Sequence, residues 1–242
     1  MANVTDPSGN WVGNDTIFVQ TGDIVDRGPD TIELYKMMHR LQFQASWTGG
    51  AVVPLLGNHE VMNMMEDYRY VTEDDVKSFG GLEERKQAWS REGTYLRTLN
   101  ITALVNGTLF LHGGLHPKWA LPSVETLNLE ARNHLLTKTP AELWNVPLFG
   151  GDGPLWYRGY AMDGEDTVCS VLDKVLSILK ANRMVIGHTP QRDGRILSRC
   201  KGRVFVIDVG ISRVYGGNAA ALEIVGDRVK ALYPSGKVVQ LA

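Results

Sequence analysis

The chain has 242 residues, and 43% of them are hydrophobic, which is enough for one large folded domain with a core. Its 25 basic and 27 acidic residues nearly balance, so no overall field favours nucleic acid or an anionic membrane. No apolar run reaches the roughly 18 residues needed to cross a bilayer, and residues 1–15 lack the apolar segment of a signal peptide. Because the charges nearly balance, any phosphate that the chain binds must be held by local side chains.

The first predicted elements are a strand, a helix and a second strand. The β-branched and aromatic run DTIFVQT (15–21) predicts the first strand. A helix is predicted from Pro29, which suits a first helical position, to Gly49. The apolar run AVVPLL (51–56) predicts the second strand. This order implies a parallel crossover, which brings the carboxyl ends of both strands to one edge of a sheet.

Two further strands are predicted later in the chain, each followed by glycine and histidine. Residues 108–111 (TLFL) lead into HGG, and residues 183–186 (RMVI) lead into GHT after a predicted helix at 168–181. Gly at these positions lets the backbone turn sharply and lets a ligand approach. Gly22-Asp23 follows the first predicted strand and Gly57-Asn58 follows the second, so four strand ends carry polar motifs.

The remaining segments predict capping excursions and a C-terminal hairpin. Residues 61–107 and 115–160 are long, charged and rich in tryptophan, so we expect them to cap the site within a single domain. RVFVIDVG (203–210) predicts another strand, and two β-branched runs joined at Gly226-Asp227 predict a closing hairpin.

The polar motifs supply one carboxylate, one amide oxygen and two imidazoles, from Asp23, Asn58, His112 and His188. This donor set suits a borderline divalent cation such as manganese, iron or zinc. Taken singly, each residue has an ordinary structural explanation as a turn residue or a core histidine. Four such motifs at four strand ends favour a metal site.

Four motifs follow one another along the chain: GDIVDRG (22–28), GNHE (57–60), HGG (112–114) and GHT (187–189). In this order they resemble the motifs of the calcineurin-like metallophosphoesterases, and specifically of the phosphoprotein phosphatase branch. Longer segments resemble the Shewanella-like protein phosphatases, namely residues 55–71, 153–161 and 207–217. The resemblance covers nearly the whole chain. It implies an α/β fold, a four-layer α/β/β/α sandwich of two mixed sheets, within one domain over residues 1–242.

The resemblance also implies a site that holds two divalent metal ions. Asp23 would bridge the ions, and Asn58, His112 and His188 would complete the shell of one of them. Two such ions activate water at neutral pH and hold the phosphoryl oxygens during in-line attack.

Four more residues acquire roles from the same resemblance. Arg27 and Arg158 would bind the phosphate through guanidinium donors, although Arg158 has ordinary packing as its alternative. His59 would protonate the leaving oxygen, and Asp26 would orient the imidazole. Tyr215 resembles a family tyrosine near the site, or is a buried tyrosine with one hydrogen bond.

The chain departs from the family pattern before Asp23. The family's Asp-x-His motif on its first strand, which binds the other metal, has no counterpart in the 22 residues there. We therefore expect one metal site, the first strand and its helix to be incomplete in this chain.

Three functions are compatible with these residues. The first is a metal-dependent phosphomonoester hydrolase acting on phosphoserine, phosphothreonine or phosphotyrosine in proteins. The second is a hydrolase of dinucleoside polyphosphates or other small phosphoesters. The third is an inactive phosphate-binding module, which the absent motif would allow. Neither nucleic acid nor a membrane span is expected as a partner.

Sequons and cysteines bear on localisation. The pattern N-x-[ST] occurs at Asn3, Asn14, Asn100 and Asn106, which favours a secretory compartment over the cytoplasm. Cys169 and Cys200 form either a pair of free thiols or one disulfide, and the sequence leaves both open.

Overall fold

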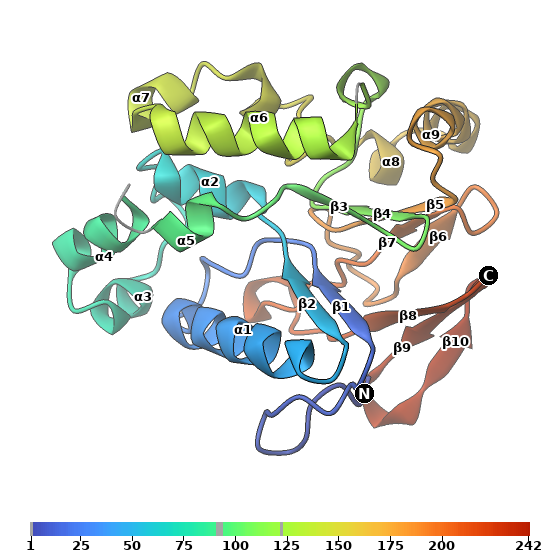
Figure 1. Cartoon of the computed structure of the whole chain (residues 1–242), viewed down its shortest axis with the longest axis horizontal. Helices are drawn as coiled ribbons and strands as arrows, with labels where there is room; N and C mark the ends of the chain where they lie inside the picture. Colours follow the sequence, from blue (N-terminus) through green and yellow to red (C-terminus); the bar gives the residue numbers. More distant parts are fainter. Residues whose placement is uncertain (1, 91–93, 122) are drawn as a thin grey trace.

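The computed structural model describes residues 2–90, 94–121 and 123–242. It has the expected α/β fold with a mixed sheet at its centre (Figure 1). Two long helices cover one face of that sheet, and smaller sheets with a third long helix lie on the other side (Figure 1). The functional motifs lie where these layers meet.

The central sheet has five strands in the order β3-β4-β5-β7-β6. Its members are β3 (Thr102–Val105), β4 (Thr108–Leu111), β5 (Arg183–Ile186), β6 (Leu197–Arg199) and β7 (Val204–Val206). β4, β5 and β7 are parallel, so the predicted strands β4 and β5 end at the same edge. The two outer strands, β3 and β6, run antiparallel to their neighbours.

Side chains of the central strands alternate between two cores. Met184 and Ile186 of β5 join the large core beneath the helices, whereas Val185 between them joins the core on the opposite face. Strand residues point alternately to the two faces of a sheet, so continuous apolar runs are what a sheet covered on both sides requires. This explains why the RMVI and TLFL runs show no polar alternation.

The helical layer consists of α6 (Val124–Thr137) and α9 (Glu165–Leu179). Buried residues recur at helical spacing along α9: Val168, Leu172, Val175 and Leu176. The predicted helix at 168–181 is thus confirmed, although it begins three residues and ends two residues earlier than predicted. In the described part of the chain, no helix combines the length and apolarity required to cross a bilayer.

A three-stranded antiparallel sheet packs on the other face. It comprises β8 (Ala221–Val225), β9 (Arg228–Leu232) and β10 (Val238–Gln240). β8 and β9 form the hairpin predicted at Gly226-Asp227. The predicted strand at 203–210 is shorter than expected, because the backbone leaves the sheet after Val206 and turns toward the site.

β1 (Ile17–Gln20) and β2 (Ala51–Pro54) form a separate parallel pair connected by α1 (Thr31–Ser46). Met38 and Leu41 of α1 pack on Val52 of β2, which closes the crossover unit. The strand, helix and strand predicted from this part of the sequence are all confirmed. Their parallel pairing brings the first two polar motifs to one edge.

The two segments expected to cap the site are mostly helical. Residues 61–107 contain most of α2 (Asn58–Met64), then α3 (Glu73–Ser78), α4 (Leu82–Trp89) and α5 (Thr94–Arg97). They also contain β3, which belongs to the central sheet rather than to a cap. Residues 115–160 contain α6, α7 (Pro140–Leu143) and the start of α8 (Gly159–Met162). Residues 91–93 and 122 lie outside the described part.

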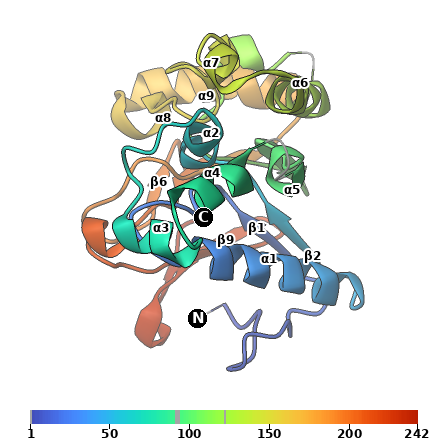
Figure 2. The same cartoon turned by 90° about the vertical axis from the view of Figure 1, so that its left-hand side faces the viewer.

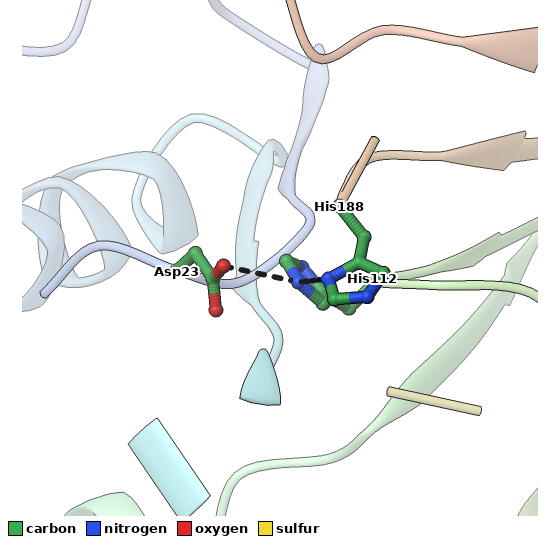
Figure 3. A group of neighbouring side chains, drawn as sticks. All are labelled: Asp23, His112 and His188. Atoms are coloured by element: carbon green, nitrogen blue, oxygen red, sulfur yellow. Dashed lines mark hydrogen bonds and ion pairs between the residues drawn. The ribbon is translucent and has the colours of Figure 1, made fainter. Parts of the chain in front are cut away.

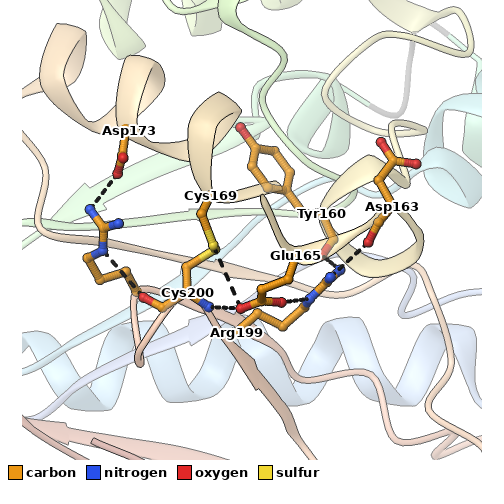
Figure 4. The surroundings of a disulfide bond; sticks show 8 residues. Tyr160, Asp163, Glu165, Cys169, Asp173, Arg199 and Cys200 are labelled. Atoms are coloured by element: carbon orange, nitrogen blue, oxygen red, sulfur yellow. Dashed lines mark hydrogen bonds and ion pairs between the residues drawn. A yellow bond between two sulfur atoms is a disulfide. The ribbon is translucent and has the colours of Figure 1, made fainter. Parts of the chain in front are cut away.

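Cys169 on α9 and Cys200 after β6 form a disulfide (Figure 4). Around it, Glu165 accepts hydrogen bonds from Arg199 Nε at 2.7 Å and from the backbone N–H of Cys200 at 2.6 Å. The bond thus joins the outer helix to the edge of the central sheet. Of the two states that the sequence left open, the structure has the disulfide.

Reducing this disulfide should lower stability. The two cysteines are 31 residues apart, and a loop of that length contributes about 3–4 kcal/mol through the entropy of the unfolded chain. We expect the melting temperature to fall by roughly 10 °C in reductant. A Cys169→Ala/Cys200→Ala variant is the control, because its melting temperature should not respond to reductant. An unchanged melting temperature after complete reduction of the parent chain would contradict the prediction.

Candidate active site

The motifs that follow β1 and β2 lie against each other. Gly22 has a φ of +94°, and any side chain there would overlap the backbone of Gly57. A side chain on Gly57 would overlap the carboxylate of Asp23. Glycine is therefore required at both positions for the two motifs to approach this closely.

Glu60 fixes the two motifs in this arrangement. Its buried carboxylate accepts hydrogen bonds from the backbone N–H groups of Asp23 at 2.9 Å, Ile24 at 2.8 Å and Gly57 at 2.7 Å. The hydroxyl of Tyr35 on α1 donates a fourth at 3.2 Å. Glu60 thereby ties the end of β1 to the start of α2.

The four residues expected to bind metal are brought together around His112. Figure 3 shows three of them, Asp23, His112 and His188. His112 Nε2 lies 3.1 Å from Asp23 Oδ2, 2.9 Å from Asn58 Oδ1 and 3.0 Å from His188 Nδ1. The ligand atoms of Asp23, His112 and His188 all lie within 4.8 Å of one another. The other ring nitrogen, Nδ1, lies 2.9 Å from the backbone oxygen of Thr21, to which it can donate.

This convergence fits a metal ion better than it fits hydrogen bonding alone. If His112 Nδ1–H donates to Thr21, Nε2 of the neutral ring presents a lone pair to two oxygens and a nitrogen. A single added proton can point at only one of them, whereas a cation accepts lone pairs from all four groups. The carbonyl on Nδ1 also fixes the ring orientation, as is usual for histidines that bind metals.

The charges of the cluster favour a bound cation. Burial opposes the charge on Asp23, but the His112 and His59 imidazoles outweigh it and lower the pKa of the carboxyl below its usual range. Burial likewise disfavours charge on His112, yet the Asp23 carboxylate raises its pKa. Burial, with His112 and Arg158 nearby, lowers the pKa of His188 to about 2, which leaves its ring neutral and able to bind a metal.

His59 and Asp26 form a buried pair beside this cluster. His59 Nδ1 lies 2.6 Å from Asp26 Oδ2, and the backbone N–H of His59 donates to Asp23 Oδ1 at 3.0 Å. The opposite nitrogen, Nε2, lies 3.9 Å from Asp23 Oδ2. The imidazole therefore points Nε2 toward the candidate metal ligands.

Arg27 lies over the same nitrogen. Its Nη1 donates to His59 Nε2 at 3.0 Å, and its guanidinium carbon lies 4.3 Å from the ring centre of Tyr70 and 5.0 Å from that of Tyr215. Both tyrosines are 37% exposed. Of the two explanations open for Tyr215, the structure places it beside Arg27.

Arg158 lies just before α8 and contacts the fourth motif. Its Nη1 donates to the backbone oxygen of His188 at 2.6 Å and to Thr189 Oγ1 at 3.1 Å. Burial lowers the pKa of Arg158, although Tyr215 and Asp208 among its electrostatic neighbours act in the opposite direction. Both hydrogen bonds use Nη1, which leaves Nη2 and Nε as the donors that can bind a phosphate.

Several of these residues have a left-handed backbone. The φ angles are +57° at Asp23, +69° at Asp26, +55° at Arg27 and +64° at His188. A residue with a side chain adopts this region at a cost on the order of 1 kcal/mol, so the surrounding fold must hold it there. Such backbone strain is concentrated at functional sites in proteins.

Besides Tyr70, which lies against Arg27, four residues near the site were not predicted from the sequence. Asn63, Asp75 and Arg85 form a buried chain of hydrogen bonds that reaches Asp26. Asp208 lies within electrostatic range of His112 and Asp23, and burial raises its pKa. Only Asn63 carried a signal: it lies four residues after His59, on the same face of the helix.

The fold and this site define a class of protein. The model of the calcineurin-like phosphoesterases matches residues 8–192. The chain therefore belongs to the calcineurin-like phosphoesterase family.

The relatives include Shewanella-like phosphatases. The chain is 39% identical to an uncharacterised protein of Schizosaccharomyces pombe, over 96% of this chain and 73% of that protein. It is 27% identical to Shewanella-like protein phosphatase 2 of Arabidopsis thaliana, over 88% of this chain but only 66% of the plant protein. A crystal structure of a cold-active protein-tyrosine phosphatase from a psychrophilic Shewanella species is similar in fold. Its TM-score is 0.85 at 28% identity, over all of this chain and 74% of that one.

Proposed function

We propose that this protein is a metal-dependent phosphomonoester hydrolase that removes phosphate from proteins. One observation carries the proposal: the side chains of Asp23, Asn58, His112 and His188 converge beside the His59–Asp26 pair and Arg27. Metal ligands, a proton donor and a phosphate-binding cation are the parts that such a reaction needs. Family membership supports the reaction class.

Asp23, Asn58, His112 and His188 would hold a divalent cation such as manganese, iron or zinc. When bound, the metal would lower the pKa of a water molecule and neutralise charge on the phosphoryl oxygens. The resemblance implies a second ion, and Asp23 would help to hold that ion as well.

The remaining residues would bind the substrate and move a proton. Arg27 can donate either to His59 Nε2, as it does here, or to a phosphate oxygen. With Arg27 on the phosphate, Nε2 is open to carry the proton that the leaving oxygen requires. Asp26 would stabilise the charged imidazole through Nδ1–H and keep Nε2 directed at the substrate.

Phosphorylated side chains of proteins are the substrates that we propose. Tyr70 and Tyr215 place partly exposed aromatic rings next to Arg27. Aromatic rings pack favourably on one another, so these rings favour phosphotyrosine over phosphoserine. The Shewanella protein that is similar in fold is a protein-tyrosine phosphatase, which supports the same class.

A substrate panel with added manganese tests the proposal. Phosphate release would be compared for phosphotyrosine peptides, phosphoserine peptides and diadenosine tetraphosphate. Hydrolysis of phosphopeptides with the highest kcat/KM on phosphotyrosine is the expected result. Faster turnover of diadenosine tetraphosphate would instead support a small-phosphoester hydrolase, and no turnover of any substrate would support a phosphate-binding module.

Arg158→Lys should weaken phosphate binding although it keeps the charge. An ammonium group cannot donate to two phosphate oxygens while also holding His188 and Thr189, as a guanidinium can. The inhibition constant for free phosphate and the KM should rise together, by roughly 10-fold if one charge-assisted hydrogen bond is lost. An unchanged inhibition constant would assign Arg158 to packing. Arg192→Lys, outside the contacts described for the site, is the control.

A further inference from the structure

A network of buried polar side chains links the cap to the His59–Asp26 pair. Arg85 on α4 donates from Nε to Asp75 Oδ2 on α3 at 2.8 Å and from Nη1 to Asn63 Oδ1 on α2 at 2.6 Å. Asn63 Nδ2 donates to Asp26 Oδ1 at 3.1 Å, and Arg85 Nη2 lies 3.5 Å from the same oxygen. The short helices α3 and α4 lie together beside α2 (Figure 2).

All side chains of this network are out of contact with water. Arg85 and Asp75 have no exposed surface, and Asn63 is 1% exposed. Aromatic rings surround the guanidinium, with ring centres 5.4–5.8 Å away at Tyr68, Phe79 and Trp89. In such surroundings a hydrogen bond to a charged group is strong and strongly directional.

This network determines which oxygen of Asp26 faces His59. Asn63 and Arg85 both act on Oδ1, so Oδ2 is the oxygen left for His59 Nδ1 at 2.6 Å. Asn63 also donates to the backbone oxygen of His59 at 2.8 Å. The carboxylate and the imidazole are thus oriented by residues from three helices.

Stability alone is a poor explanation for this buried network. Within the described residues, Asp75 Oδ1 and Arg85 Nη2 are buried without a hydrogen bond. Buried ion pairs with unsatisfied atoms are often no more stable than apolar side chains of the same size. Orienting Asp26 is a role that such a network can have besides stability.

We propose that Arg85, held by Asp75, is a positioning residue that acts through Asn63 and Asp26 to direct His59 Nε2 at the leaving oxygen of the substrate. The role of His59 as the proton donor belongs to the proposed function, so this inference rests on it. The prediction is that loss of Arg85 selectively slows substrates that need a proton on the leaving group. Substrates that leave unaided should be affected much less.

Arg85→Met tests this, because methionine keeps much of the length but has no donor. The kcat for phenyl phosphate should fall at least about 10-fold more than the kcat for p-nitrophenyl phosphate, a part of the 10²–10⁴-fold that general acid catalysis supplies. Arg85→Lys should recover little of the loss, since an ammonium group cannot reproduce the paired hydrogen bonds of the guanidinium to Asp75 and Asn63. Retained metal content would show that the ligands are intact.

The matched control is Arg97→Met. Arg97 is another buried arginine next to the cap, and it donates to the backbone oxygens of Leu135 and Trp89 rather than toward the site. It should destabilise the fold without changing the ratio of the two kcat values. If Arg85→Met fails to fold because Asp75 is left buried and charged, the double variant Asp75→Asn/Arg85→Met replaces it.

An NMR measurement tests the geometry without any turnover. The short contact between His59 Nδ1 and Asp26 Oδ2 should give a far-downfield imidazole proton, identified by its loss in His59→Asn. Arg85→Met should shift or broaden this signal, and Arg97→Met should leave it in place. An unchanged signal together with an unchanged kcat ratio in folded Arg85→Met would overturn the inference. If the parent protein is inactive but its signal still responds to Arg85→Met, the result would count against the proposed function. It would not count against the positioning of His59 by Arg85.

Discussion

Replacing His59 with asparagine should slow turnover by about 10²–10⁴-fold, the usual contribution of a general acid. Asparagine can keep a hydrogen bond to Asp26 but has no proton to give at the position of Nε2. The loss should be largest for substrates whose leaving oxygen is strongly basic, such as phosphoserine peptides and phenyl phosphate. For p-nitrophenyl phosphate, whose leaving group departs without a proton, the loss should be much smaller.

Steady-state kinetics on this series, with metal content measured in parallel, check the expectation. His59 is not a ligand of the proposed ion, so bound metal should be unchanged. His116→Asn is the control, because His116 contacts Lys118 and Tyr157 away from the cluster. Equal losses on all substrates would remove His59 from the role of proton donor.

Replacing His112 with alanine should abolish both metal binding and turnover. His112 Nε2 lies within 3.1 Å of ligand atoms from Asp23, Asn58 and His188, so it occupies the centre of the proposed shell. Removing an outer-shell partner typically costs 10–100-fold in metal affinity, and losing a direct ligand should cost more than 100-fold. Phosphate release should fall to background.

Metal titration followed by calorimetry would measure the affinity. His39→Ala is a suitable control, because His39 on α1 packs against Tyr95 on α5 and lies outside the cluster. It should retain the affinity of the parent chain. A His112→Ala variant that binds manganese as tightly as the parent would show that the ion binds elsewhere.

The sequence predicted the parts of the site that strand order dictates. Parallel pairing of β1 with β2 brings Asp23 and Asn58 to one edge, and that of β4 with β5 brings His112 and His188 to another. The two pairs belong to different sheets, and contacts of His112 with Thr21 and Asn58 join them. Pro29 and Gly49 were sufficient to predict α1, which lies within these limits at Thr31–Ser46. The α/β fold class came from the resemblance to the calcineurin-like metallophosphoesterases, and the structure confirms it.

The cap could not be predicted in the same way. Asp75 and Arg85 lie in short helices rich in charge, where such residues are ordinarily solvated, and only the packing of α3 and α4 on α2 buries them. β3 looked like part of that excursion because a four-residue edge strand carries little pattern. Cysteine pairing depends on distances in the fold, so the sequence left the Cys169–Cys200 bond open.

The most direct test of the metal site is a reconstitution measurement on the 242-residue chain. The protein would be stripped with a chelator and titrated with manganese, while bound metal and phosphate release from phosphotyrosine peptide are followed together. We expect both to be lost on chelation, and activity to return as manganese fills the tight site formed by Asp23, Asn58, His112 and His188. Full activity in the stripped protein, or tight manganese binding that restores none, would contradict a metal-dependent phosphatase built on these four residues.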